Sequence, residues 1–545
     1  MRQAPAAVLS RRHKAAPCLR PLALSISALL FGGAFIDTAS AASFPAGINL
    51  SSLNGSDGFR FEGLQDFGYA GMSVSNAGDI NGDGIDDLII GASGESPGVG
   101  GAGSSYVIFG RSTAFTPILA PSSIDGSNGF RIDGIAIGDV SGISVSAAGD
   151  VNADGIDDLI VGAARADPNG SGSGSAYIVF GQTTAFASTL SLSTLNGSNG
   201  FRLDGEAGND SAGRSVSGTG DVNGDGIDDL IIGALLADGG ASNAGSSYVV
   251  FGQSTPFGAT LALSILNGSN GFRLDGEATE DRSGVSVSGA GDINGDGLAD
   301  LVIGARYADP NGSSSGSSYV VFGQSTAFTP ILALSGLNGA NGFRLDGVGA
   351  GDSLGVSVSA AGDINGDGVD DVIIAARFAG PTAAGNSYVI FGQTAAFAST
   401  LVLSTLDGTS GFRLDGAAVG DSAGSAVSAA GDINGDGVDD LIVGANRAGA
   451  NGPDSGSSFV IFGQSTGFAP TLELSGLNGS NGFRLDGIAA GDYTGGSVSA
   501  AGDISGDGVD DLIIGAPRSS ANGDYSGSSY VVFGRGDKFF EDGFE

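Results

Sequence analysis

The sequence predicts an all-β fold, a seven-bladed β-propeller. A stretch that reads GDINGDGIDDLIIGA at 78–92 recurs seven times. The first Asp of each copy falls at 79, 150, 221, 292, 363, 432 and 503, so the copies are 71 residues apart except for one interval of 69. Each period also contains four short strand patterns and no helical pattern. A constant period of short strands is typical of a propeller.

The repeated stretch opens with oxygen-bearing side chains. In the first copy these are Asp79, Asn81, Asp83 and Asp87. Ca²⁺ takes six to eight oxygen ligands, and the sharp turn needs a residue such as Gly84 that adopts positive φ easily. An EF-hand loop would place Glu at its twelfth position before a helix, but here that position is Ile90, inside an apolar run typical of a buried strand. The stretch therefore predicts a calcium loop between two strands, with the backbone carbonyl of Ile85 as a further ligand.

Each period supplies four strands to a four-stranded blade. In the first period they are the FR strand at 58–63, SVS at 73–75, DLIIGA at 87–92 and SSYVIFG at 104–110. The small residues of SVS suit the crowded innermost position. Closing the ring removes exposed sheet edges. We therefore expect the first FR strand, 58–63, to pair with the last strand, 529–534, and to close the seventh blade.

Residues 1–41 predict a secretory signal peptide. Basic residues precede the apolar segment 21–36, and Ala39-Ser40-Ala41 fits a cleavage site. A membrane anchor is the alternative, but the small residues after the apolar segment favour cleavage. No later segment is apolar enough to span a membrane. The expected location is secreted, extracellular or at the cell surface.

The composition of the chain excludes several classes of functional site. The only Cys and the only His, Cys18 and His13, lie in the leader, so the rest of the chain excludes disulfides, Cys or His nucleophiles and Cys/His zinc sites. A net charge of −37 argues against nucleic-acid binding by bulk charge. The 41% hydrophobic content argues against disorder.

The unit G-x-S-V-S-x-x-G-D-x-N-G-D-G-x-D-D-L-I-I-G-A resembles the FG-GAP repeat of the integrin α-subunit propeller, and 515–517 spell GAP itself. The resemblance covers about residues 44–534 and leaves 535–545 as a C-terminal tail. It implies that the loops bind Ca²⁺, up to seven ions, between the first and second strands of each blade. The implied ligands are Asp79, Asn81, Asp83, Asp87, Asp150, Asn152, Asp154, Asp158, Asp221, Asn223, Asp225, Asp229, Asp292, Asn294, Asp296, Asp300, Asp363, Asn365, Asp367, Asp371, Asp432, Asn434, Asp436, Asp440, Asp503, Ser505, Asp507 and Asp511.

The sequence also departs from that family. The Phe of the FG pair is absent, and the even spacing leaves no room for an inserted ligand-binding domain. We expect no leg domains after the propeller. Ser505 is a weaker ligand than the Asn of the other loops. We therefore expect a secreted, bacterial-type propeller alone, with adhesion implied by the resemblance only.

Two classes of function remain open. The first is a calcium-binding extracellular adhesion or ligand-binding module. The second is a propeller-based extracellular hydrolase or lyase acting on polysaccharide or phospholipid. Binding without catalysis is favoured, because the calcium loops account for nearly all the periodic acids and no blade carries a distinctive insertion.

The basic residues after the leader point to a ligand face. Seven are the arginines of the FR strands and are interpreted as structural, through an ion pair or through packing of their stems. Five recur six or seven residues after the last calcium Asp, in the loop after DLIIGA: Arg165, Arg306, Arg377, Arg447 and Arg518. The others, Arg111, Arg214, Arg282, Arg535 and Lys538, share no common place. Radial symmetry would gather the five on one face. There they would bind an anionic extracellular protein or glycan, or pair with acids of neighbouring blades.

Overall fold

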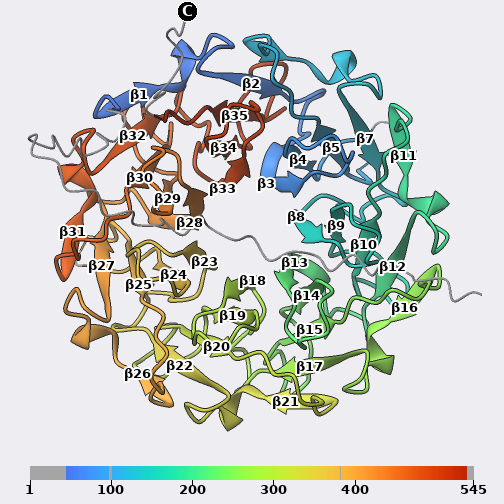
Figure 1. Cartoon of the computed structure of the whole chain (residues 1–545), viewed down its shortest axis with the longest axis vertical. Coiled ribbons are helices and arrows are strands. Elements are labelled where there is room, and N and C mark those ends of the chain that lie inside the picture. The colour runs from blue at the N-terminus through green and yellow to red at the C-terminus, as the bar shows by residue number, and fades with distance from the viewer. Residues whose placement is uncertain (1–43, 97–100, 381, 537–545) are drawn as a thin grey trace, which may run out of the picture. The chain divides into compact units, whose positions relative to one another are not determined.

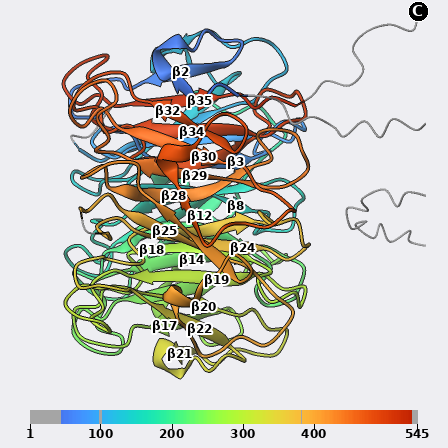
Figure 2. The ribbon, with the colours of Figure 1, turned by 90° about the vertical axis from the view of Figure 1, so that its left-hand side faces the viewer.

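The computed structural model describes residues 44–96, 101–380 and 382–536. These residues form seven five-stranded sheets arranged radially about one axis (Figure 1). Figure 2 shows the same sheets from the side, with loops emerging on both faces. The predicted signal peptide and residues 537–545 of the predicted tail lie outside the described residues. Within the described part of the chain, no helix is long and apolar enough to cross a membrane.

The blades are numbered I to VII by their innermost strand, and the strands of each blade are named in order from the axis outward. Blade I holds β3 (Ala70–Gly78), β4 (Asp87–Ala92), β5 (Ser104–Ile108), β7 (Gly129–Asp133) and β11 (Thr189–Ser191). Blade II holds β8 (Ser144–Gly149), β9 (Asp158–Ala163), β10 (Ser175–Val179), β12 (Gly200–Asp204) and β16 (Thr260–Ala262). Blade III holds β13 (Ala212–Gly220), β14 (Asp229–Ala234), β15 (Ser246–Val250), β17 (Gly271–Asp275) and β21 (Ile331–Ala333).

The remaining four blades repeat this arrangement. Blade IV holds β18 (Ser286–Gly291), β19 (Asp300–Ala305), β20 (Ser317–Val321), β22 (Gly342–Asp346) and β26 (Thr400–Leu401). Blade V holds β23 (Val358–Gly362), β24 (Asp371–Ala376), β25 (Asn386–Ile390), β27 (Gly411–Asp415) and β31 (Thr471–Glu473). Blade VI holds β28 (Ala423–Gly431), β29 (Asp440–Ala445), β30 (Ser457–Ile461), β32 (Gly482–Asp486) and β1 (Gly47–Asn49). Blade VII holds β33 (Ser497–Gly502), β34 (Asp511–Ala516), β35 (Ser528–Val532), β2 (Gly58–Glu62) and β6 (Ile118–Leu119).

Short 3₁₀ turns follow the fifth strands. They are η1 (Leu50–Ser52), η2 (Pro121–Ser123), η3 (Leu192–Thr194), η4 (Leu263–Ile265), η5 (Leu334–Gly336), η6 (Leu403–Thr405) and η7 (Leu474–Gly476). Their first residue is a buried Leu in every turn except η2.

The predicted strand order is confirmed, with SVS innermost, but the prediction of four strands per blade is wrong. A fifth strand of two or three residues pairs in parallel with the fourth, as β11 does with β7 through Thr189 and Arg131. It comes from the segment that leads into the next period. Such a strand is too short to show an alternating pattern, and its side chains are exposed or half-buried except for Leu119 of β6, so it is defined mainly by backbone hydrogen bonds.

The ring closes through the N-terminal segment. The expected pairing is confirmed, because β2 runs antiparallel to β35, with Gly58 opposite Val532 and Glu62 opposite Ser528. The structure adds a second closure, because β1 pairs in parallel with β32 of blade VI. Two successive blades are thus completed by strands from the start of the chain.

The core lies between neighbouring sheets. One cluster joins Ile160 and Phe201 of blade II to Leu230 and Tyr248 of blade III, all at most 1% exposed. Six similar clusters fill the other interfaces. The second strand of every blade, DLIIGA or a close variant, is buried along its whole length because sheets cover both of its faces.

Strand direction separates the loops into two faces. Neighbouring strands of the first four in a blade are antiparallel, so the loops before and after the second strand lie at its opposite ends. The face that carries the loops between first and second strands is called the calcium-loop face. The opposite face carries the loops between second and third strands, and the segments from the fourth strand to the next blade. It is called the arginine face.

Candidate functional site

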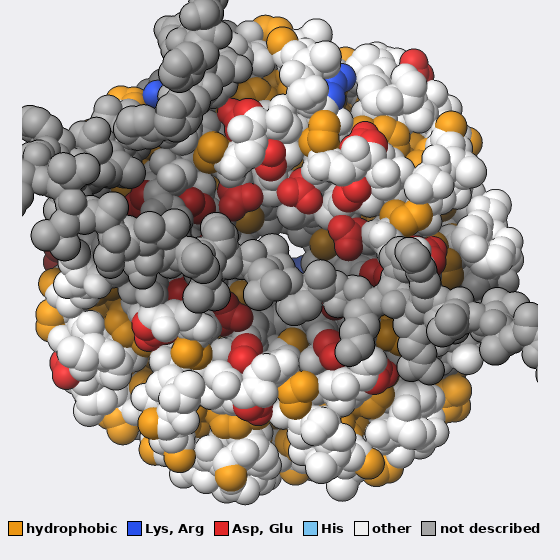
Figure 3. All heavy atoms as spheres, viewed as in Figure 1, with side chains coloured by type: hydrophobic (Ala, Val, Ile, Leu, Met, Phe, Trp, Pro, Cys, Tyr) orange, Lys and Arg blue, Asp and Glu red, His pale blue; other side chains and the backbone are white. Residues whose placement is uncertain are grey.

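The seven predicted calcium loops surround the axis. In blade I the loop runs between the end of β3 at Gly78 and the start of β4 at Asp87. Gly78 and Gly84 have φ of 62° and 89°, conformations that glycine adopts without strain. Figure 3 shows one face of the molecule with acidic side chains gathered around its centre, where loops next to the innermost strands must lie.

Hydrogen bonds within the loop curl the backbone around its first carboxylate. Oδ1 of Asp79 accepts a bond of 2.9 Å from the N–H of Asp83, and Oδ2 accepts one of 2.8 Å from the N–H of Gly84. Oδ1 of Asp83 accepts from the N–H of Ile85 at 3.1 Å. The same bonds recur in the other six loops. The spacing of Asp and Gly therefore produces one loop conformation seven times.

The last predicted ligand of the loop is buried. Asp87 has no exposed surface, and its carboxylate accepts from the N–H of Gly110 at 2.9 Å and from the amide of Asn81 at 3.1 Å. Burial raises the pKa of Asp87 to about 8, and the charges of Asp83 and Asp79 act in the same direction. The equivalent carboxyls of the other six loops shift in the same direction. A buried carboxylate beside two other acids is costly without a nearby cation.

The donor set suits a hard divalent cation. Every candidate side chain offers oxygen, and within the described residues no basic side chain forms an ion pair with a loop carboxylate. As the side chains stand, however, no three acids converge closely enough to enclose a metal in the described ranges. Metal binding at the predicted residues therefore stays a proposal, supported by the oxygen donors and the buried Asp87.

A further loop carboxylate links the blades. Oδ2 of Asp157 in blade II accepts a bond of 2.9 Å from the N–H of Asp79 in blade I. Five other interfaces repeat this bond. In blade IV the equivalent residue is Ala299, whose own N–H instead donates to the carbonyl of Asp221 at 3.1 Å. Sequence reasoning did not assign these carboxylates, although the Asp-Asp pair in six of the loops was a signal for two separate roles.

The five predicted ligand-face arginines lie in the loops between second and third strands, on the arginine face. The structure adds Arg214, which projects from the innermost strand β13 and keeps solvent access although it is crowded by its neighbours. This crowding lowers the pKa of Arg214, as do the charges of Arg306 and Arg165. Burial likewise lowers the pKa of Arg377, together with the charges of Arg306 and Arg447. These arginines therefore form one group of neighbouring cations, called the arginine arc, which consists of Arg165, Arg214, Arg306, Arg377 and Arg447.

None of these five arginines, nor Arg518, has a carboxylate oxygen within 4.0 Å among residues 44–96, 101–380 and 382–536. Pairing with acids of neighbouring blades is thus not what the structure shows. Three guanidinium groups lie over aromatic rings instead. The distances to the ring centroid are 4.7 Å for Arg306 over Tyr307, 4.4 Å for Arg377 over Phe378 and 4.4 Å for Arg518 over Tyr493.

The arginines of the FR strands behave differently, and their structural interpretation through an ion pair is confirmed. Each forms an ion pair with the acid two residues later in its strand. Arg273 and Arg344 also reach Glu206 and Glu277 at 3.0 Å. Within the described residues, the FR arginines are thus neutralised by ion pairs, whereas the members of the arginine arc are not.

Comparison with known proteins agrees with this architecture. A family model described as FG-GAP repeat matches residues 70–108, 141–179, 212–250, 283–321, 354–390, 423–461 and 494–532. Integrin alpha pat-2 of Caenorhabditis elegans is 31% identical over 253 residues, which are 45% of this chain and 18% of that protein. The phosphatidylinositol-glycan-specific phospholipase D of Dictyostelium discoideum is 28% identical over 328 residues, which are 56% of this chain and 32% of that protein. The chain thus spans a third or less of either relative.

A solved structure of BBS1N in complex with ARL6DN, soaked with lead, aligns with 88% of this chain and 96% of that chain, with a TM-score of 0.40 and 10% identity. A likeness at that level supports no argument. The repeat matches coincide with the seven blades, since each begins at or shortly before the start of an innermost strand and ends with the third strand. The chain is an integrin-α-like FG-GAP repeat β-propeller.

Proposed function

We propose that this chain is a secreted, calcium-stabilised ligand-binding module whose arginine face binds an anionic extracellular partner, such as an acidic polysaccharide. The observation that carries the proposal is the arginine arc, a group of five neighbouring arginines that have no carboxylate partner among the described residues, in a chain of net charge −37. Like charges that converge without a counterion raise the free energy of the folded state, and a bound anion relieves that cost. The match to an integrin alpha supports a role in ligand binding.

Calcium has a structural role in this proposal. The loops lie on the opposite face from the arginine arc, so a bound ion would stabilise the blades rather than contact the ligand. In blade I the ion would be held by Asp79, Asn81, Asp83 and Asp87. The equivalent residues would hold it in the other blades. When bound, the ion supplies the positive charge that the buried carboxylates lack.

The test is a triple variant, Arg306→Ala, Arg377→Ala and Arg447→Ala, with binding to alginate, polygalacturonate and hyaluronan measured at several salt concentrations. The matched control replaces Arg131, Arg413 and Arg484 by Ala. It changes the net charge equally but removes only arginines that already form ion pairs. We expect the first variant to lose at least tenfold in affinity and much of the salt dependence, and the control to bind as wild type. Equal binding by all three proteins would overturn the proposal.

A hydrolase or lyase acting on phospholipid or polysaccharide is the second candidate. The observation that favours it is the match to a phosphatidylinositol-glycan-specific phospholipase D. Incubation of the purified protein with phosphatidylinositol-glycan and with the same polysaccharides, followed by mass spectrometry of the products, tests it directly. The main function would be catalysis and not binding if products form at a rate proportional to the concentration of the protein. Their formation should also persist after the leader has been removed.

A further inference from the structure

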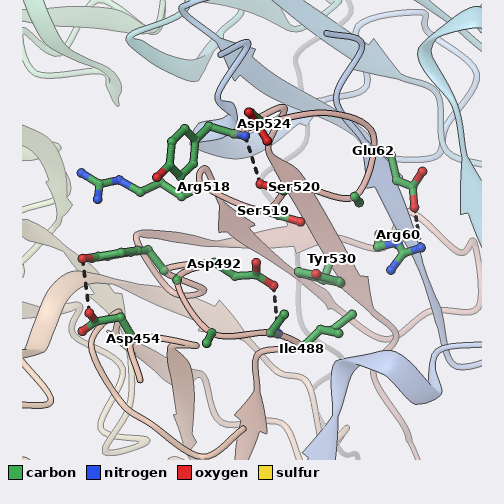
Figure 4. Close-up of a pocket in the computed structure, with 16 residues that line it drawn as sticks. Arg60, Glu62, Asp454, Ile488, Asp492, Arg518, Ser519, Ser520, Asp524 and Tyr530 are labelled. Atoms are coloured by element: carbon green, nitrogen blue, oxygen red, sulfur yellow. Dashed lines mark hydrogen bonds and ion pairs between the residues drawn. The ribbon is translucent and has the colours of Figure 1, made fainter. Parts of the chain in front are cut away.

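A cleft on the arginine face breaks the sevenfold repeat. It lies between blades VI and VII and has a volume of about 800 Å³. The equivalent cleft between blades V and VI measures about 420 Å³. Figure 4 shows the larger cleft with Arg518 and Asp454 at one end, and with the Arg60–Glu62 ion pair at the other. Tyr493 and Tyr525 belong to its lining.

Tyrosines occupy backbone positions in this cleft that suit them poorly. Tyr493 and Tyr525 have φ of 57° and 52°, in the left-handed region that is costly for residues with a bulky side chain. The repeat shows what the fold itself requires there. The place of Tyr493 is taken by serine in three other blades, at 211, 353 and 422, and by Tyr69, Val140 and Arg282 in the remaining three. The place of Tyr525 is taken by Gly101, Gly172 and Asn243 among others. All of these residues also have positive φ.

Two more aromatic residues extend the same surface. Phe67 and Tyr69 lie in the segment from blade VII to blade I, with φ of 58° and 53°. Their ring centroids are 5.8 Å and 6.3 Å from that of Tyr525. Phe67 is 50% exposed and Tyr525 is 41% exposed. Four aromatic residues in strained conformations thus gather in one sector, where smaller residues would serve the fold equally well. Strain that the fold does not need points to function.

The polar groups beside these rings favour a neutral ligand over an anion. Asp454, Asp492 and Asp524 line the cleft, whereas Arg60 is paired with Glu62 and Arg518 lies over Tyr493. Carboxylates accept hydrogen bonds from hydroxyl groups, and the hydroxyls of Ser519 and Ser520 can donate or accept. An aromatic ring covers an apolar surface and keeps its polar edge in water. A pyranose ring, which has an apolar C–H face and a rim of hydroxyls, complements both features.

We propose that the cleft between blades VI and VII is a binding site for a neutral oligosaccharide, with Tyr493 and Tyr525 stacking on sugar rings and Asp454 and Asp524 accepting hydrogen bonds from their hydroxyls. The ring of Tyr493 is held in place by two contacts. Its hydroxyl donates to Oδ2 of Asp454 at 3.4 Å, and the guanidinium of Arg518 lies 4.4 Å from its centroid. The site needs neither the arginine arc nor a charged ligand, so it extends the binding surface beyond the proposed anionic partner.

The test uses the repeat to design the variant. Tyr493→Ser and Tyr525→Asn together install residues that other blades carry at the same places, and so keep the backbone conformation. Tyr307→Leu is the matched control, because it removes an aromatic ring of the arginine face at a place where blade III has Leu236. Binding of cellohexaose, laminarihexaose, mannohexaose and xylohexaose is measured by saturation-transfer NMR and calorimetry in calcium buffer. Hexalysine and oligogalacturonate serve as charged probes.

We expect at least one neutral hexasaccharide to bind wild type and Tyr307→Leu equally well. Its affinity for the double variant should be at least tenfold lower. The melting temperature of the double variant should equal or exceed that of wild type. The triple arginine variant should keep this binding, which separates the cleft from the arginine arc. The proposal is overturned if no neutral hexasaccharide binds wild type at millimolar concentration, if the double variant binds as well as wild type, or if the two tyrosines instead govern binding of a charged probe.

Discussion

The hydroxyl of Tyr106 donates a hydrogen bond to Oε2 of Glu95, a carboxylate with no exposed surface. In five other blades the acids near the equivalent tyrosine come from a different loop, the segment that leads into the blade: Asp139, Glu206 with Asp210, Glu277 with Asp281, Asp352 and Asp492. Blade I has Gly68 at that place, and a Cβ there would lie 2.9 Å from Cγ of Glu95. The buried carboxylate has therefore moved from one loop to another while its position beside the tyrosine has been kept.

This exchange predicts that the stability effects of substitutions at Gly68 and Glu95 are strongly non-additive. Glu95→Ala leaves the hydroxyl of Tyr106 without a partner, which should cost about 1–3 kcal/mol. Gly68→Asp alone should also destabilise, because the new side chain meets Glu95. The double variant carries the residue pair of blade II, where Asp139 and Ala166 occupy these two places in the repeat, and should recover most of the lost stability. Urea unfolding of the four proteins measures the coupling, and simple addition of the two single effects would contradict the exchange.

Glu95 also predicts a pH effect. Burial raises its pKa above the ordinary 4.5. The folded state therefore holds this proton more tightly than the unfolded state. The stabilisation is present below the ordinary pKa and is lost as pH rises through the raised value. Glu95→Gln does not titrate, so wild type should lose stability relative to this variant as pH rises from the ordinary value of 4.5 through the raised pKa. Unfolding of both proteins in a pH series is the measurement, and a constant difference would count against the prediction.

The inter-blade carboxylates predict a stability effect that does not depend on metal. Oδ2 of Asp228 accepts a bond of 2.9 Å from the N–H of Asp150, and its removal in Asp228→Ala should cost about 1–3 kcal/mol. Asp228→Asn keeps an acceptor and should cost less. Ala299 shows that the fold tolerates alanine at this place. Thermal unfolding in calcium and in chelator should show the same loss, and a loss confined to calcium buffer would mean that Asp228 acts through the metal.

The sequence predicts most of this fold because the same pattern occurs seven times in it. Blade number, strand order and the pairing of β2 with β35 all follow from the spacing. The fifth strands do not, because a segment such as 189–191 has no side-chain pattern and forms only when the neighbouring β7 offers its free edge.

Some residues of the candidate site can likewise be predicted from the sequence, and others cannot. The loop residues are visible because oxygen side chains recur in register. Arg214 is not visible in the sequence, because the equivalent positions of the other periods carry residues such as Met72, Ile143 and Val285. Only closure of the ring brings Arg214 beside Arg306. The aromatic cleft is hidden for another reason, since a sequence does not show that Tyr493 must adopt positive φ.

Calcium removal should lower stability strongly. A ligand that binds only the folded state stabilises it by RT ln(1 + [L]/Kd), about 2.7 kcal/mol per site at a hundredfold excess over Kd. Up to seven loops add such contributions, and removing the metal also restores repulsion among their carboxylates. We expect a much lower melting temperature in EDTA, with metal content verified by mass spectrometry. The loop with Ser505 should lose its ion first. An unchanged melting curve after complete metal removal would refute a calcium role.

The double closure of the ring predicts that the start of the described chain is as important as any internal segment. Phe44 stacks on Phe483 of blade VI at 4.4 Å, as Phe186 stacks on Phe130 of blade I at 4.2 Å. Both Phe44 and Phe186 are buried, so replacing either by Ala should cost about 3–5 kcal/mol if its segment is firmly packed.

Phe186→Ala is the control for this prediction, because its segment is held by chain on both sides. Unfolding of the two variants should give similar losses of stability, and hydrogen exchange in Phe44→Ala should increase at β1 and at its partner β32. A loss for Phe44→Ala far below that for Phe186→Ala would show that β1 frays in solution. Closure would then depend on β2 alone, which pairs with β35 over five residues, whereas β1 contacts β32 over only three.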